Sequence, residues 1–106
     1  SARVVQEFQT DINRHLTAFN EACEKGEEEM FEQATHGLMG VSGTFGATQL
    51  ESLSKTANRL IRGGNFKAAF AMQAEINRHS EEVLENSKQR LNAMTDHTNL
   101  TEENDA

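Results

Sequence analysis

Apolar residues recur at intervals of three and four over most of the chain, which is the pattern of amphipathic helices. The first run covers residues 4–23 and is interrupted at Gly26, which precedes the acidic segment EEE. Acidic residues suit the first turn of a helix because the helix dipole favours negative charge there. The spacing therefore predicts a long first helix that ends before Gly26. Its expected apolar face consists of Val4, Val5, Phe8, Ile12, Leu16, Phe19 and Cys23.

A second helix is predicted from the acidic segment to Gly46. Its apolar positions run straight through a stretch in which every third residue from 37 to 46 is glycine. Glycine inside a helix costs roughly 1 kcal/mol relative to alanine, so these glycines need a compensating reason. The expected core side chains of this helix are Phe31, Ala34, Leu38, Val41 and Phe45.

Two further helices are predicted in the second half of the chain. Thr48 and Glu51 have the spacing of a capping box, with Thr48 as the N-cap of a third helix. Its apolar face consists of Leu50, Leu53, Ala57, Leu60 and Ile61, and it ends at Gly63-Gly64. Asn65 then suits the N-cap of a fourth helix of about 25 residues or more. The expected buried stripe of that helix is Phe66, Ala69, Phe70, Ile76, Val83, Leu91 and Met94.

Four amphipathic helices joined by short connections bury their apolar faces best as an antiparallel bundle. We therefore predict an all-α, antiparallel four-helix bundle over residues 1–94. Residues 95–106 carry four acidic side chains and no lysine or arginine. Because the apolar pattern fades there, we expect these residues to form an acidic, disordered tail.

The charge and composition exclude several classes of partner. The formal net charge is −7, which argues against nucleic-acid binding because that rests on clustered lysine and arginine. The longest apolar runs are far shorter than the roughly 20 residues that cross a bilayer, so we expect no membrane contact. Cys23 is the only cysteine, which leaves no internal disulfide. Because the chain opens with Ser1 instead of methionine, we expect a domain cut from a longer protein.

The outward face of the second helix carries a histidine beside glycines. On a helix that advances about 100° per residue, His36 lies about 180° from the core-facing side, and Gly40 and Gly43 lie within about 40° of it. Glu29 and Glu32 precede it on the same side. Bare glycines would let another protein bring a reactive group against the imidazole. The same spacing also fits glycines that let a neighbouring helix pack closely, and spacing alone does not decide.

The segment ATHGLMGVSGTFGATQLESL, residues 34–53, resembles the signature of histidine-containing phosphotransfer (HPt) domains. In that signature, small residues precede the phosphorylated histidine, an aliphatic residue and small residues follow it, and a glycine turn leads into a leucine-rich helix. The matching positions are Ala34, Thr35, His36, Leu38, Gly40, Gly43, Phe45, Gly46, Ala47, Leu50 and Leu53. The resemblance extends over about residues 8–90, because the acidic lead-in and the GGN turn also fit.

This resemblance implies that His36 accepts a phosphoryl group from a receiver-domain aspartate and passes it to another receiver. It implies response-regulator receiver domains and a sensor histidine kinase as partners of a cytoplasmic, monomeric phosphotransfer intermediate without autonomous catalysis. The resemblance fits both a stand-alone domain and a part of a hybrid kinase. It would bind no cofactor or metal itself, because the receiver supplies Mg²⁺. The expected partner-binding residues are Glu32, Gln33, Met39, Gly40 and Gly43. Glu32 or Gln33 could also hydrogen-bond a ring nitrogen of His36 and fix which nitrogen attacks.

One position departs from the family pattern. A lysine commonly stands three residues after the histidine, whereas this sequence has Met39. An apolar side chain cannot offset phosphoryl charge, so Lys55, Arg59 or the partner would have to supply a cation. The alternative hypothesis is a docking module with the HPt fold, which binds a receiver or kinase without turning over phosphate.

A metal-binding helix bundle is a further hypothesis, from a different class. The pairs Glu32/His36 and Glu75/His79 are each four residues apart, so each pair shares a helix face and could supply two ligands. Known di-iron bundles instead project Glu-x-x-His pairs into the core, whereas His36 is expected to point outward. The remaining histidines, His15 and His97, have the pattern of ordinary polar positions.

Overall fold

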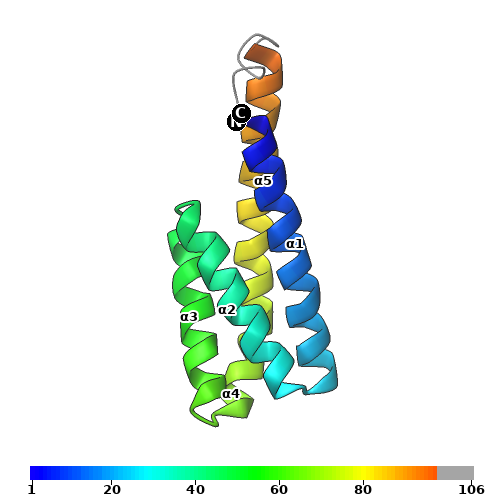
Figure 1. Cartoon of the computed structure of the whole chain (residues 1–106). Coiled ribbons are helices and arrows are strands. Elements are labelled where there is room, and N and C mark those ends of the chain that lie inside the picture. The colour runs from blue at the N-terminus through cyan, green and yellow to red at the C-terminus, as the bar shows by residue number, and fades with distance from the viewer. Residues whose placement is uncertain (98–106) are drawn as a thin grey trace.

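The computed structural model describes residues 1–97, which form helices joined by short turns (Figure 1). In chain order these are α1 (Ala2–Lys25), α2 (Glu28–Thr44), α3 (Thr48–Arg62), α4 (Phe66–Phe70) and α5 (Gln73–His97). The four long helices run antiparallel, short α4 lies at one end, and α1 and α5 extend beyond α2 and α3 at the other (Figure 1). The all-α, antiparallel bundle predicted from the sequence is confirmed.

Glycines with positive φ close three of the connections. Gly26, Gly46 and Gly64 have φ values of 64°, 73° and 81°, a conformation that other residues rarely adopt. They follow α1, α2 and α3 respectively. The ends that the sequence predicted for these three helices are therefore confirmed.

The predicted capping box at the start of α3 is wrong. Ala47 holds the N-cap position without a side-chain bond, and Thr48 is already helical, with its hydroxyl donating to the Gly46 carbonyl at 3.3 Å. The Glu51 carboxylate does not reach back to the cap but lies against Gly43 of α2. Packing between the two helices thus uses the side chain that local capping would have used.

The predicted fourth helix is divided into two. Asn65 is the N-cap of α4 but makes no side-chain capping bond, and a turn at residues 71–72 separates α4 from α5. No glycine or proline marks this break. Directly before it, the Phe70 ring packs edge-on against Phe31 of α2, with centroids 5.1 Å apart. Phe66, expected in the buried stripe, is 40% exposed instead, because α4 crosses the end of the bundle.

The core draws on all four long helices. Val4, expected to be apolar core, is exposed near the start of α1. The Phe19 and Phe31 rings lie between α1 and α2, with centroids 5.1 Å apart. Burying one such large side chain contributes roughly 1.5–3 kcal/mol to stability. The largest fully buried apolar side chains are Phe19, Phe31, Ile12, Leu38, Leu50 and Ile76.

Amide side chains join α1 to α5. Asn20 and Asn77 donate to each other at 2.9 and 2.8 Å, and Gln73 also donates to Asn20 at 3.0 Å. Farther along the same pair, Gln9 donates to Ser87 at 3.0 Å. Because partly buried amides need such partners, these bonds favour one register of α1 against α5.

Helix α5 continues through His97, three residues beyond Met94, where the apolar pattern ends. The helix thus runs three residues past the bundle boundary predicted at residue 94, and the division of the chain into a bundle and a tail stays a prediction. The rest of the predicted acidic tail lies outside the described residues, as does the side chain of His97. Within residues 1–97, no helix is long and apolar enough to span a membrane.

Candidate functional site

His36 lies near the middle of α2 and its side chain is exposed. On the opposite side of the same helix, Phe31 and Leu38 are fully buried. The rotation of α2 is therefore the one that the spacing of its apolar residues predicted. No hydrogen bond or ion pair within the described part of the chain engages the His36 ring, so its nitrogens face solvent without a protein partner.

A polar clamp fixes the backbone of α2 directly before His36. The Thr35 hydroxyl is fully buried and donates to the carbonyls of Phe31 and Glu32 at 2.9 and 3.1 Å. Asn58 of α3 donates its amide to the Glu32 carbonyl at 3.1 Å and to the Thr35 hydroxyl at 3.2 Å. The clamp resists rotation of α2 because these groups would otherwise be buried without partners. Sequence reasoning missed Asn58, which looks like any polar residue beside an apolar stripe.

Gly37 is covered by a histidine from α1. A Cβ atom placed on Gly37 would overlap the His15 ring, so the absence of a side chain allows the imidazole to lie against the α2 backbone. Burial, and then the positive charge of Arg14, lower the pKa of His15, while Asp11 acts in the opposite direction. His15 is therefore a helix-packing residue and not the ordinary polar position that the sequence predicted.

Gly40 and Gly43, which the sequence grouped together, have different surroundings. No atom lies within 4 Å of a Cβ placed on Gly40, whereas a Cβ on Gly43 would overlap the Glu51 carboxylate. Gly40 therefore leaves open space one turn from His36, as access to the imidazole requires. Gly43 instead permits close contact between α2 and α3. The packing explanation that the sequence left open therefore applies to Gly43, while access for a partner at Gly40 stays a prediction.

The other predicted partner-binding residues surround His36 without touching its ring nitrogens. Glu32 forms an exposed ion pair with Arg62 of α3, with Oε1 and Nε 3.4 Å apart. Gln33 is exposed and Met39 is half-buried. The expected hydrogen bond from Glu32 or Gln33 to the imidazole is absent from the described residues, because the Glu32 carboxylate turns toward α3. Their role in partner binding stays a prediction.

The residues proposed for a metal site do not converge. No group of three or more His, Cys, Asp or Glu side chains able to hold a metal occurs among residues 1–96. The Nδ1 atom of His79 lies 3.8 Å from Glu82, on its own helix, and not beside a ligand from another helix. The metal-binding hypothesis therefore gains no support.

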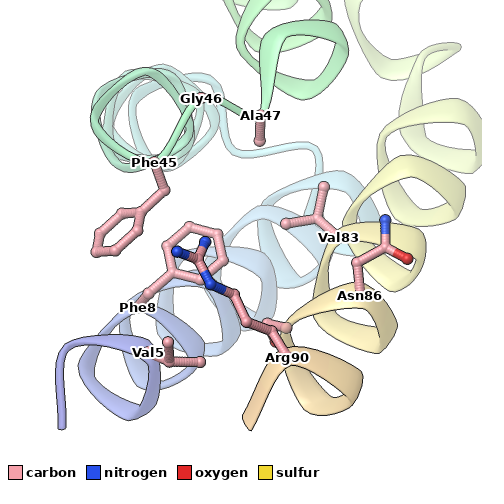
Figure 2. A pocket seen from close by; sticks show the side chains of 9 residues that line it. Val5, Phe8, Phe45, Gly46, Ala47, Val83, Asn86 and Arg90 are labelled. Atoms are coloured by element: carbon pink, nitrogen blue, oxygen red, sulfur yellow. The ribbon is translucent and has the colours of Figure 1, made fainter. Parts of the chain in front are cut away.

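A cavity of about 220 Å³ opens between α1, the α2–α3 turn and α5. Figure 2 shows Phe8 and Phe45 on one wall, with Arg90 reaching in from α5. The two rings are 4.4 Å apart, and Phe45 is 37% exposed instead of belonging to the core as predicted. The reason is that the chain leaves the helix at Phe45 and turns at Gly46. His36 does not line this cavity.

The geometry thus consists of an exposed histidine, an open glycine and a fixed backbone on the second helix of an antiparallel bundle. Comparison with known families matches the Hpt domain over residues 3–98. The chain belongs to the HPt domain family. This HPt domain is a phosphorelay signalling module, and its partners in general are response-regulator receiver domains. No match came from the comparisons with curated proteins and with solved structures.

When it is neutral, an exposed imidazole has a ring-nitrogen lone pair with which it can attack an electrophile. Because HPt domains act on groups that a partner brings, access matters more than a deep pocket. The open space at Gly40 provides that access. The Asn58 clamp keeps the backbone beneath the ring in place.

Proposed function

We propose that His36 is the phosphoacceptor of this HPt domain. A neutral ring nitrogen attacks the phosphorus of a receiver's aspartyl phosphate, the O–P bond breaks as the N–P bond forms, and the aspartate is released as a carboxylate. The reverse sequence on a second receiver returns the phosphoryl group to an aspartate. Positioning and charge neutralisation dominate phosphoryl transfer, and Mg²⁺ bound by the receiver supplies much of that charge.

One observation carries this proposal: His36 is exposed next to the open space at Gly40. A receiver must bring its aspartyl phosphate to within bonding distance of the ring, which side chains on that side would obstruct. Gln33, Met39, Glu32 and Gly43 surround this approach and are the residues that we expect a receiver to contact. The domain acts on this account as a cytoplasmic monomer that binds no metal of its own.

The test is phosphorus NMR of the whole chain after mixing with a panel of phosphorylated receiver domains and Mg²⁺. We expect a phosphohistidine signal in the wild type that is absent in His36→Gln. His79→Gln is the matched control, because it removes a different histidine and should keep the signal. If His36→Gln still acquires the signal, His36 is not the acceptor.

A docking module without turnover is the second candidate function, and Met39 is the observation that favours it. This side chain places no charge beside His36. If at least one receiver binds the wild type and none transfers a phosphoryl group to it, the docking function replaces the transfer function. Met39→Lys would then show whether the missing charge is the cause.

A further inference from the structure

The neighbouring helices α2 and α3 each carry a stripe of residues with the same spacing. On α2 the stripe is Glu32, His36, Met39 and Gly43, and on α3 it is Glu51, Lys55, Asn58 and Arg62. Both stripes have steps of four, three and four residues, which keep side chains on one helix face. Because the helices are antiparallel neighbours (Figure 1), the first residue of one stripe faces the last residue of the other.

Three contacts establish this register. Arg62 pairs with Glu32 at 3.4 Å, and Asn58 donates to the Glu32 carbonyl at 3.1 Å. At the other end, the Glu51 carboxylate lies against Gly43. This register places Asn58 opposite His36 and Lys55 opposite Met39. The Asn58 amide is already engaged, because it donates to the Glu32 carbonyl and the Thr35 hydroxyl. Met39 is the stripe residue that follows His36.

Lys55 is the cation of this stripe whose charge is free. Its side chain is exposed, and it takes part in no ion pair or hydrogen bond of the described residues. Arg62 is already paired with Glu32. Arg59 is exposed but points farther away from α2. At about 100° per residue, Arg59 lies about 80° from the mean direction of the three α3 residues that contact α2, whereas Lys55 lies about 40° from it.

A phosphoryl group on His36 needs such a cation. It adds about two negative charges to a helix face that already carries Glu29 and Glu32. Met39 supplies no charge, and Arg62 is engaged by Glu32. The flexible four-carbon stem of lysine lets its ammonium group move toward a phosphoryl group on the neighbouring helix.

We propose that Lys55 binds the phosphoryl group carried by His36 and supplies from α3 the positive charge that Met39 does not supply from α2. This inference rests on the proposed function of His36. Lys55 is then a phosphoryl-binding residue that favours both the formation and the survival of the phosphohistidine.

The experiment uses the whole chain and phosphoramidate, a small phosphoryl donor that needs no receiver. The His36 nitrogen attacks its phosphorus, the donor N–P bond breaks, and the departing ammonia takes up the proton that the imidazole loses. Phosphorus NMR gives the labelling rate and the lifetime of the phosphohistidine. We compare the wild type with Lys55→Gln, Lys55→Arg and Arg59→Gln, with His36→Gln as the blank.

At low salt we expect Lys55→Gln to label roughly three- to fivefold more slowly, as for an exposed charge interaction. Lys55→Arg should keep the wild-type rate, and Arg59→Gln should change it less than Lys55→Gln does. Met39→Lys should restore labelling to Lys55→Gln. The difference should shrink at about 1 M salt, because screening weakens a charge interaction but does not repair a structural defect.

Two results would overturn the role of Lys55 or that of His36. If the wild type labels at His36 and Lys55→Gln matches it at low salt, or is slowed equally at all salt concentrations, Lys55 does not bind the phosphoryl group. If the wild type and His36→Gln both fail to label with phosphoramidate and with every receiver, the proposed function of His36 fails and the role of Lys55 falls with it.

Discussion

Gly37 and Gly40 lie one turn apart on α2 and meet opposite surroundings. The space beside Gly37 is filled by the His15 ring, whereas the space beside Gly40 is empty. Both positions give up the helix stability that a side chain would add, but for different reasons. At Gly37 the gain is contact between α1 and α2, and at Gly40 we propose that it is access to His36. One residue type at regular spacing therefore meets a packed neighbour at one position and open space one turn later.

Gly37→Leu should have the largest effect on stability. The new side chain would displace the His15 ring and separate α1 from α2, so we expect a loss of about 1–3 kcal/mol in the free energy of unfolding. Urea denaturation measures it. Adding His15→Ala should recover part of the loss, because it removes the overlapping ring. A Gly37→Leu protein as stable as the wild type would contradict the tight contact seen between His15 and Gly37.

Gly40→Ala should raise the free energy of unfolding instead of lowering it. Its Cβ meets no atom within 4 Å, so the variant should gain up to about 1 kcal/mol of stability from helix propensity. If His36 functions as proposed, the same methyl group obstructs a receiver, so we expect slower transfer from a receiver phosphate but an unchanged labelling rate with small phosphoramidate. Thermal unfolding and the two labelling assays measure these quantities. Equal receiver transfer in Gly40→Ala and wild type would mean that the open space is not used.

The stability of Gly43→Ala should lie between the stabilities of Gly37→Leu and Gly40→Ala. The added methyl group would displace the Glu51 carboxylate, but that group ends a flexible side chain and can move toward solvent. The gain in helix propensity and the cost of this movement should nearly cancel, leaving a change within about 0.5 kcal/mol. Urea denaturation tests this, with Glu51→Ala as background. In the Glu51→Ala background the added methyl group meets no carboxylate, so Gly43→Ala should raise the free energy of unfolding.

Much of the fold could be predicted because the information is local. The apolar spacing gave the long helices, and Gly26, Gly46 and Gly64 gave three of their ends. The break between α4 and α5 could not be predicted, since no glycine or proline marks it and the neighbouring contact between Phe70 and Phe31 joins residues far apart in the sequence. The same reason explains the capping prediction that failed at the start of α3, where Glu51 contacts another helix.

The candidate site also combines features that local sequence predicts with features that depend on contacts between helices. The position of His36 on the exposed face follows from helical periodicity alone, and so does its distance along the helix from Gly40. The contact of His15 with Gly37 and the clamp from Asn58 depend on which helices are neighbours and on their register. A single sequence contains no direct signal for that register, because an isolated polar residue looks the same whether it packs or faces solvent.

The smallest predicted effect is a pH dependence that originates at His15. Burial, followed by the charge of Arg14, lowers the pKa of His15 below its ordinary value of 6.5, although Asp11 opposes the shift. The unfolded chain therefore binds a proton at a higher pH than the folded chain does. The stability contributed by the neutral ring is present above pH 6.5 and is lost as the pH falls from there through the folded-state pKa.

The free energy of unfolding between pH 8 and pH 5 measures this contribution as the difference between wild type and His15→Gln. That difference should decrease on acidification, and the control Gly40→Ala, which leaves His15 in place, should follow the wild-type profile. Gly37→Leu should follow the His15→Gln profile instead, because an expelled imidazole titrates at the same pH in the folded and unfolded states. If Gly37→Leu keeps the wild-type pH dependence, the His15 ring is still buried in that variant. Contact with His15 then does not explain why Gly37 differs from Gly40.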